Sequence, residues 1–172
     1  MVALAAACGG GSATAGSAGS TATGKASTPD AWTSLELTDV DGATFTLADL
    51  KGTPIVVENF ATWCSNCLRQ LGDTQKAAAA AGETAMFVAL SVETDIDPAD
   101  VRSYAKDKGF TDIRFAVMTP EMAAAMQDAF GTTALNPPST PKIVIDADGT
   151  PGKMVTGFES PDEIAAKITA AS

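Results

Sequence analysis

The junction between an apolar run and a pair of cysteines is the feature that most limits how this chain can fold. The run at residues 55–60 leads into Ala-Thr-Trp-Cys-Ser-Asn-Cys at residues 61–67, and a helical pattern follows. Two cysteines separated by two residues can close a small disulfide ring. The first of them, Cys64, would lie at a helix N-terminus, where unpaired backbone N–H groups stabilise a thiolate. Strand, turn and helix therefore predict thiol–disulfide exchange.

Strands and helices alternate along the rest of the chain. Three helices are expected where a capping residue is followed by proline, at Asp97, Thr119 and Ser160. A hairpin is expected around Asp41-Gly42. The expected strands of the sheet are 55–60, 85–92, 112–118, 142–146 and 153–157. This order predicts an α/β fold, with a central mixed sheet flanked by helices and an N-terminal β-hairpin extension.

The N-terminal segment differs in composition from everything after it. Residues 1–30 are mostly Gly, Ala, Ser and Thr, so we expect a disordered tether ahead of a folded domain at 31–172. Residues 2–9 are similar to the end of a bacterial lipoprotein signal, which makes Cys8 a candidate for lipid attachment. The alternative is a free thiol on a flexible arm. Either interpretation predicts an extracytoplasmic protein, anchored to a membrane or secreted, because disulfides persist there.

Composition excludes several functions. The net charge of −10 leaves no basic stripe to replace phosphate counterions, so we expect no nucleic-acid partner. The chain has no histidine, which removes Ser-His and Cys-His catalysis and every zinc site that needs imidazole. We therefore expect neither a bound metal nor a cofactor. No apolar run approaches the ~20 residues that span a bilayer.

Several motifs at matching distances give the chain a family resemblance. They are Asp41-Gly42, Leu50-Lys51-Gly52, the block at 61–67, Thr140-Pro141, Gly149 and Gly157. On these residues the chain resembles the thioredoxin superfamily, and within it the TlpA/ResA-like branch of membrane-tethered extracytoplasmic proteins. The resemblance covers residues 34–170 and implies a thioredoxin-like fold.

The resemblance also implies roles for the residues around the cysteine pair. Cys64 would be the attacking thiolate and Cys67 the resolving thiol. Pro141 would be a cis-proline that faces the disulfide, although a trans proline starting an edge strand is the alternative. Thr140 would offer backbone hydrogen bonds to a substrate strand. Trp63 would pack beside the ring and shield Cys64, or simply fill the core.

Glu58 occupies the position of a buried acid that assists removal of the proton from the resolving cysteine. A carboxyl group inside a strand buried on both faces is desolvated, which raises its pKa and lets it act as a base near neutrality. The alternative is a structural glutamate paired with a nearby lysine. Gln70 stands where many relatives carry a glutamate, so no acid–base role is expected there.

Relatives in this branch reduce cysteines of apocytochrome c or other exported proteins and are reset by a membrane electron donor, so these partners are implied for this chain. The same residues could oxidise exported thiols instead. A thiol peroxidase is a second possibility, but Ala61 and Val57 replace the hydroxyl residue and the proline that its motif requires. A non-catalytic surface lipoprotein that binds a partner or Cu(I) is the third.

Overall fold

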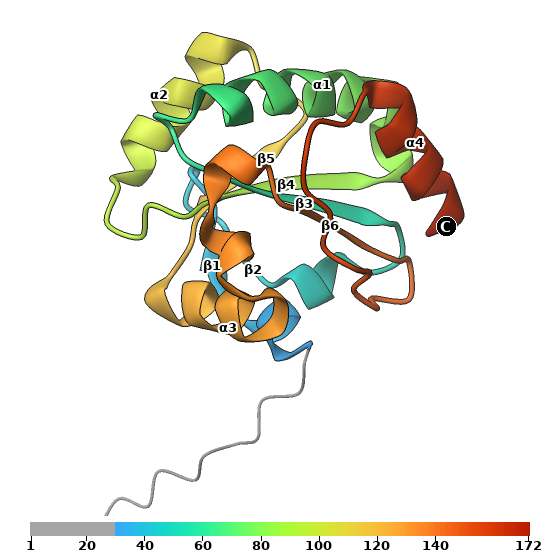
Figure 1. The fold of residues 1–172 in the computed structure, drawn as a ribbon, viewed down its shortest axis with the longest axis horizontal. Coiled ribbons are helices and arrows are strands. Elements are labelled where there is room, and N and C mark those ends of the chain that lie inside the picture. Colours follow the sequence, from blue (N-terminus) through green and yellow to red (C-terminus); the bar gives the residue numbers. More distant parts are fainter. Residues whose placement is uncertain (1–29) are drawn as a thin grey trace, which may run out of the picture.

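A four-stranded sheet forms the centre of the protein, for which the computed structural model describes residues 30–172. Strands β3 (Ile55–Phe60), β4 (Met86–Ser91) and β5 (Arg114–Val117) run parallel, and β6 (Lys142–Ile145) pairs with β3 in the antiparallel direction. The strand order is β5-β4-β3-β6 (Figure 1). The predicted mixed sheet is therefore confirmed, with β3 in an interior position.

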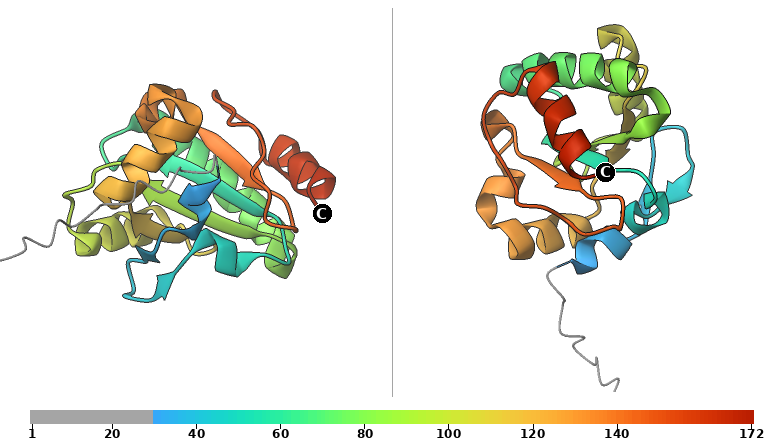
Figure 2. Two further views of the ribbon diagram at one scale, coloured as in Figure 1. Left: turned by 90° about the horizontal axis from the view of Figure 1, so that it is seen from below. Right: turned by 90° about the vertical axis from the view of Figure 1, so that its right-hand side faces the viewer.

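Helices cover both faces of this sheet. They are α1 (Ser65–Ala81), α2 (Pro98–Lys108), α3 (Pro120–Phe130) and α4 (Pro161–Ala170). Helices α1, α2 and α4 lie on one face, while α3 lies on the other together with the short 3-10 helices η1 (Ala31–Ser34) and η2 (Leu47–Leu50) (Figures 1 and 2). Helices α2, α3 and α4 start at the predicted prolines, each after a side-chain cap.

Two apolar cores follow from the alternation of side chains along the strands. In β3, Val56 and Phe60 point into the core beneath α1, α2 and α4. Ile55 and Val57 point to the opposite face, where the α3 methionines Met122 and Met126 are fully buried. Successive residues of a strand point to opposite faces. Glu58 therefore points to the same face as Val56 and Phe60, beneath α1.

The N-terminal hairpin is present in a shortened form. Strands β1 (Leu37–Thr38) and β2 (Thr44–Phe45) pair antiparallel, and Gly42 in the turn between them has a φ of 91°. That backbone conformation carries little cost for glycine. The hairpin is fastened to the edge of the sheet by the hydrogen bond from Val40 N to Phe115 O, at 2.9 Å.

The strand predicted at 153–157 is wrong as a continuous element. This segment contacts β6 through the isolated bridge between Lys142 and Val155, and a second isolated bridge joins Ile145 to Pro151, just before the segment. Three steps along β6 therefore face four steps along the other segment, so the register slips by one residue between the bridges. Proline also has no N–H to donate to a ladder. The chain passes β6 without becoming a fifth strand.

Candidate active site

The cysteine pair lies where the sequence places it, at the start of α1. Cys64 is the N-cap of this helix, and its Sγ accepts a hydrogen bond from Cys67 N at 3.1 Å. The two residues form a disulfide, with Cα atoms 5.2 Å apart. When that bond opens, the same N–H group and the helix N-terminus stabilise negative charge on Cys64.

The two sulfur-bearing residues differ in their access to the surface. Cys67 is fully buried, whereas Cys64 keeps 3 % of its surface exposed. A surface hollow of about 440 Å³ lies beside Cys64, and its walls come from the start of α1 and from α2. Its lining residues are Thr62, Trp63, Cys64, Ser65, Leu68, Tyr104, Asp107 and Lys108. A visiting sulfur atom can therefore approach Cys64 and not Cys67.

Trp63 is 65 % exposed, which excludes the alternative that it fills the core. Instead it stands at the surface as one wall of the hollow beside Cys64. Leu68, on the first turn of α1, is also an exposed large hydrophobic residue. The hollow thus has an apolar rim, and exposed apolar surface of this kind is typical of contact sites for other molecules.

The loop before β6 meets the disulfide directly. Pro137 O lies 3.2 Å from Cys67 Sγ, and Asn66 Nδ2 donates a hydrogen bond to Pro138 O at 2.9 Å. In the reduced protein the Cys67 thiol can donate a hydrogen bond to the Pro137 carbonyl. The short 3-10 helix η5 (Pro137–Ser139) therefore packs against the cysteine-bearing end of α1.

Thr140 and Pro141 follow in the same loop. Thr140 is buried, with a left-handed backbone conformation (φ 49°, ψ 59°). Its N–H donates to Pro137 O at 2.7 Å, and its C=O accepts from the ammonium group of Lys142 at 2.8 Å. Pro141 O accepts from Asn59 N at 3.0 Å. In this disulfide state the Thr140 N–H is thus bonded within the protein, whereas the Thr140 and Pro141 carbonyls have one partner each and can accept a second hydrogen bond.

Glu58 is buried beneath α1, where its Oε2 accepts a hydrogen bond from Thr74 Oγ1 at 2.6 Å. Its Oε1 is buried with no hydrogen-bond partner among residues 30–172. Burial raises the pKa of Glu58 to about 7, outweighing the Thr74 hydrogen bond and the charge of Lys142, which both lower it. The carboxyl group is therefore able to exchange a proton near neutral pH.

The position of Glu58 limits how it can serve Cys67. Thr74 follows Cys67 by seven residues, which is about two helical turns or ~10 Å along α1. Glu58 and Cys67 are therefore associated with parts of α1 about two turns apart, and no hydrogen bond between the carboxyl group and the Cys67 sulfur is found among residues 30–172. Gln70, between them in the sequence of α1, donates a hydrogen bond from Nε2 to Thr74 Oγ1 at 3.5 Å.

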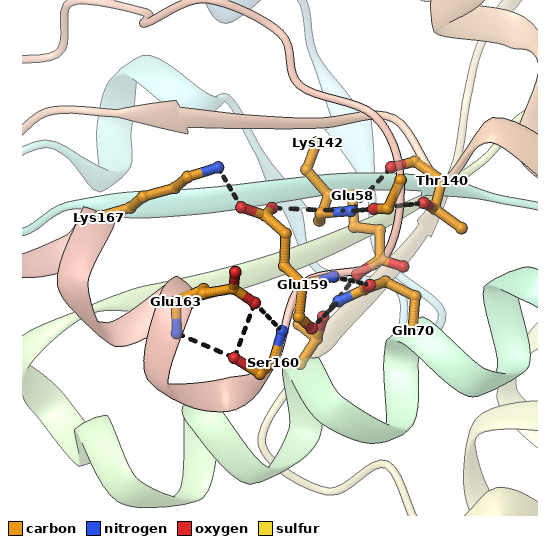
Figure 3. Close-up of polar contacts among 10 residues, drawn as sticks. Glu58, Gln70, Thr140, Lys142, Glu159, Ser160, Glu163 and Lys167 are labelled. Carbon is orange, nitrogen blue, oxygen red and sulfur yellow. Dashed lines mark hydrogen bonds and ion pairs between the residues drawn. The ribbon is translucent and has the colours of Figure 1, made fainter.

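A polar network that sequence reasoning missed surrounds Glu58 (Figure 3). Lys142 lies opposite Glu58 in the β3–β6 register, yet no ion pair between them is found within the described part of the chain. The Lys142 ammonium instead lies 3.7 Å from Glu159 Oε2, and Glu159 also pairs with Lys167 of α4. Burial lowers the pKa of Lys142, while the charges of Glu58 and Glu159 raise it. The signal in the sequence was a lysine opening an otherwise apolar strand.

Gln70 belongs to the same network. Its side chain accepts from Glu159 N at 2.8 Å and donates to Glu159 O at 3.1 Å. It thus ties α1 to the segment before α4 through neutral hydrogen bonds.

The candidate residue for lipid attachment belongs to the N-terminal segment. Cys8 lies outside the described residues. Within residues 30–172, no helix has the length and apolar character required to cross a membrane. In the same range, no cluster of three or more His, Cys, Asp or Glu side chains is arranged to hold a metal ion.

A dithiol at the N-terminus of a helix, on a mixed sheet with helices on both faces, defines a thioredoxin-like thiol–disulfide oxidoreductase. The family model described as Redoxin matches residues 17–167, so the chain belongs to that family. The resemblance to the thioredoxin superfamily is thereby confirmed. A comparison with proteins of curated function finds no match.

Solved structures with the same fold support this assignment. A thiol:disulfide interchange protein of the thioredoxin family from Chlorobium tepidum is 26 % identical, with a TM-score of 0.66 over 80 % of this chain and 92 % of that one. The exposed lipoprotein thioredoxin Etrx1 of Streptococcus pneumoniae is also 26 % identical, with a TM-score of 0.64 over 79 % and 98 %. A secreted Mycobacterium tuberculosis disulfide oxidoreductase homologous to DsbE of E. coli is 22 % identical, with a TM-score of 0.61 over 81 % and 97 %.

Proposed function

We propose that the protein reduces disulfides of exported proteins with its Cys64–Cys67 dithiol. The observation that carries this proposal is the placement of the two sulfurs. Cys64 caps a helix at the edge of a surface hollow, while Cys67 is buried behind it. The outer sulfur suits attack on a substrate, and the inner one suits release of that substrate.

The reaction proceeds in two exchange steps. The Cys64 thiolate attacks one sulfur of the substrate disulfide, so a mixed disulfide forms and the other substrate sulfur leaves as a thiolate. The Cys67 thiolate then attacks Cys64 Sγ, which re-forms the Cys64–Cys67 disulfide and releases the second substrate sulfur. Two electrons pass from the enzyme to the substrate. A membrane electron donor then returns the enzyme to its dithiol form.

Glu58 is the proposed acceptor of the Cys67 proton. Its pKa of about 7 supports this role, because the group is partly ionised at neutral pH. Glu58 and Cys67 share no hydrogen bond among residues 30–172, so the proposed transfer runs through an intervening group. The role therefore predicts a change in the pH dependence of the second step when Glu58 is replaced, rather than loss of the first step.

An extracytoplasmic site of action is part of the proposal. Two proteins of the same fold are described as an exposed lipoprotein and as a secreted protein. Residues 1–30 would serve as the tether of the folded domain at 31–172, with Cys8 carrying the lipid. Mass spectrometry of the N-terminal peptide from a membrane fraction would detect the added acyl chains.

Reduction of insulin with dithiothreitol as electron donor tests the activity. We expect turnover by the wild-type protein, none by Cys64→Ser, and a trapped mixed disulfide with Cys67→Ser. Failure of the wild type would contradict the proposal. Peroxide consumption that requires Cys64 would favour the peroxidase instead, and stoichiometric Cu(I) uptake without turnover would favour the binding protein.

The redox potential of the Cys64–Cys67 couple tests the direction of electron flow. A reductant should have a potential near that of thioredoxin, ~−270 mV, whereas an oxidant lies near −120 mV. Equilibration with glutathione buffers of known ratio measures it. A value at the oxidising end would reverse the proposed direction while keeping the same residues.

A further inference from the structure

The turn before Pro141 has an unfavourable backbone conformation. Thr140 is the one non-glycine residue of the range 30–172 with a positive φ, at 49°. A β-branched side chain rarely adopts this conformation, and the residue before a proline is normally extended. A conformation of this kind persists only where its surroundings hold it, and such positions cluster at functional sites.

Lys142 lies beside this turn and helps to hold it (Figure 3), together with the hydrogen bond that Thr140 Oγ1 donates to Gly157 O at 2.7 Å. The Lys142 side chain is 2 % exposed. Its Nζ donates hydrogen bonds to Thr140 O at 2.8 Å and to Gly157 O at 2.7 Å, and lies 3.7 Å from Glu159 Oε2. An ammonium group has three donors. Two of them reach these carbonyls, a longer contact runs to Thr140 Oγ1 at 3.5 Å, and Glu159 is an ion-pair partner. The buried charge thus joins the turn to the segment before α4.

The same turn determines the contacts of the dithiol. The N–H of Thr140 donates to Pro137 O at 2.7 Å, and Pro137 O lies 3.2 Å from Cys67 Sγ. The next carbonyl, that of Pro138, accepts from the side chain of Asn66, which lies between the two cysteines. A change in the conformation of Thr140 would therefore move the carbonyl groups that face the cysteine-bearing end of α1.

We propose that Lys142 is a positioning residue for thiol–disulfide exchange. It holds the Thr140–Pro141 turn in the conformation that keeps the Pro137 and Pro138 carbonyls against the cysteine-bearing end of α1 and that receives the substrate. This inference rests on the proposed function. Lys142 acts through the Thr140 carbonyl and is itself fully buried, so it touches neither the substrate nor the sulfurs. A role as a mere counter-ion of Glu58 would not require the two bonds to backbone carbonyls.

The kinetic test uses Lys142→Met, which keeps the length and apolar stem of the side chain. We expect KM for insulin to rise about tenfold while kcat changes less than about twofold, because substrate binding is lost rather than chemistry. Reaction with a small aromatic disulfide, which does not need the turn, should stay within about twofold of the wild type.

A paired variant separates this role from general destabilisation. Glycine adopts a positive φ at little cost, so Thr140→Gly should make the turn independent of the lysine. KM of the double variant Lys142→Met/Thr140→Gly should therefore return to that of Thr140→Gly alone. If Lys142→Met does not fold, Glu159→Gln removes the negative charge beside the ammonium and should raise KM in the same direction by a smaller factor.

Hydrogen exchange gives a readout that does not depend on activity. The amide of residue 140 should lose at least about tenfold in protection in Lys142→Met and recover it in the double variant. Unchanged protection and KM in a folded Lys142→Met protein would overturn the inference, as would an equal loss with the small disulfide. A wild-type protein that does not reduce insulin would contradict the proposed function alone, since the exchange measurement would still decide the role of Lys142.

Discussion

Glu58 places a carboxyl group where folding normally excludes one. It lies in the interior strand β3 beneath α1, with Thr74 as its hydrogen-bond donor. Folding raises its pKa from the ordinary 4.5 to about 7. Between these pH values the folded chain therefore retains a proton that the unfolded chain has lost. The free energy of unfolding thus falls by on the order of 3 kcal/mol as the pH rises through this window. Above the window this contribution stays constant.

Replacing this carboxyl group should remove the pH dependence. We expect Glu58→Gln to be more stable than the wild type by roughly 1–3 kcal/mol near pH 8, and to differ by less than about 1 kcal/mol near pH 5. Urea unfolding of both proteins at the two pH values measures the difference. An equal difference at both values would show that the side chain acts through packing and not through its charge.

At the scale of residues, the sequence identified what local chemistry specifies. The spacing of Cys64 and Cys67 after a strand is enough to place them at a helix start, and the structure places them there. Lys142 and Glu159 could not be found in this way, because their proximity depends on the β3–β6 register and on how the segment before α4 returns over the sheet. Such contacts are tertiary, and no short pattern encodes them.

Helix α1 contains one residue that works against it. Gly72 lies in its interior, and a Cβ added there would meet no atom within 4 Å. Glycine in a helix costs conformational entropy relative to alanine. The helix that carries both cysteines is therefore less stable than its length allows.

We expect Gly72→Ala to stabilise the protein by about 0.5–1 kcal/mol. Gly109, which ends α2, serves as a matched control because an added Cβ also meets nothing within 4 Å, but its φ is +72°. Gly109→Ala should therefore destabilise by about 1 kcal/mol. Urea unfolding compares the two. Loss of stability in Gly72→Ala would mean that α1 needs a deformable point beside the dithiol.

The success of element prediction followed the strength of local signals. The predicted starts of α2, α3 and α4 were correct because the capping residue and the proline after it both act within the first turn of the helix. The strand predicted at 153–157 was wrong because pairing is decided by the neighbouring strand. Pro151 and the register slip interrupt the ladder with β6, although the local sequence is suited to extended structure.

At the scale of the whole molecule, the two faces of the sheet differ in the residues that they bury. The side covered by α1, α2 and α4 holds the dithiol, Glu58 and the charged network, whereas the α3 side is an apolar core. Alternation along β3 produces both sides from six consecutive residues. The fold class was predictable because strands and capped helices alternate along the chain from residue 55 onwards. The position of the charged network on one side could not be predicted, because it depends on how the strands assemble into the sheet.

This two-sided construction gives the protein its own optical signal of redox state. Trp32 is buried in the α3-side core, edge-on to Phe130, whereas Trp63 is exposed to water beside the disulfide. A disulfide quenches a neighbouring indole, and an exposed indole emits at longer wavelength than a buried one. Reduction should therefore brighten the long-wavelength emission and leave the short-wavelength emission unchanged. Fluorescence spectra of the oxidised and reduced variants measure this response. Trp63→Phe should lose it, and Trp32→Phe should keep it. A response that persists in Trp63→Phe and disappears in Trp32→Phe would contradict the geometry.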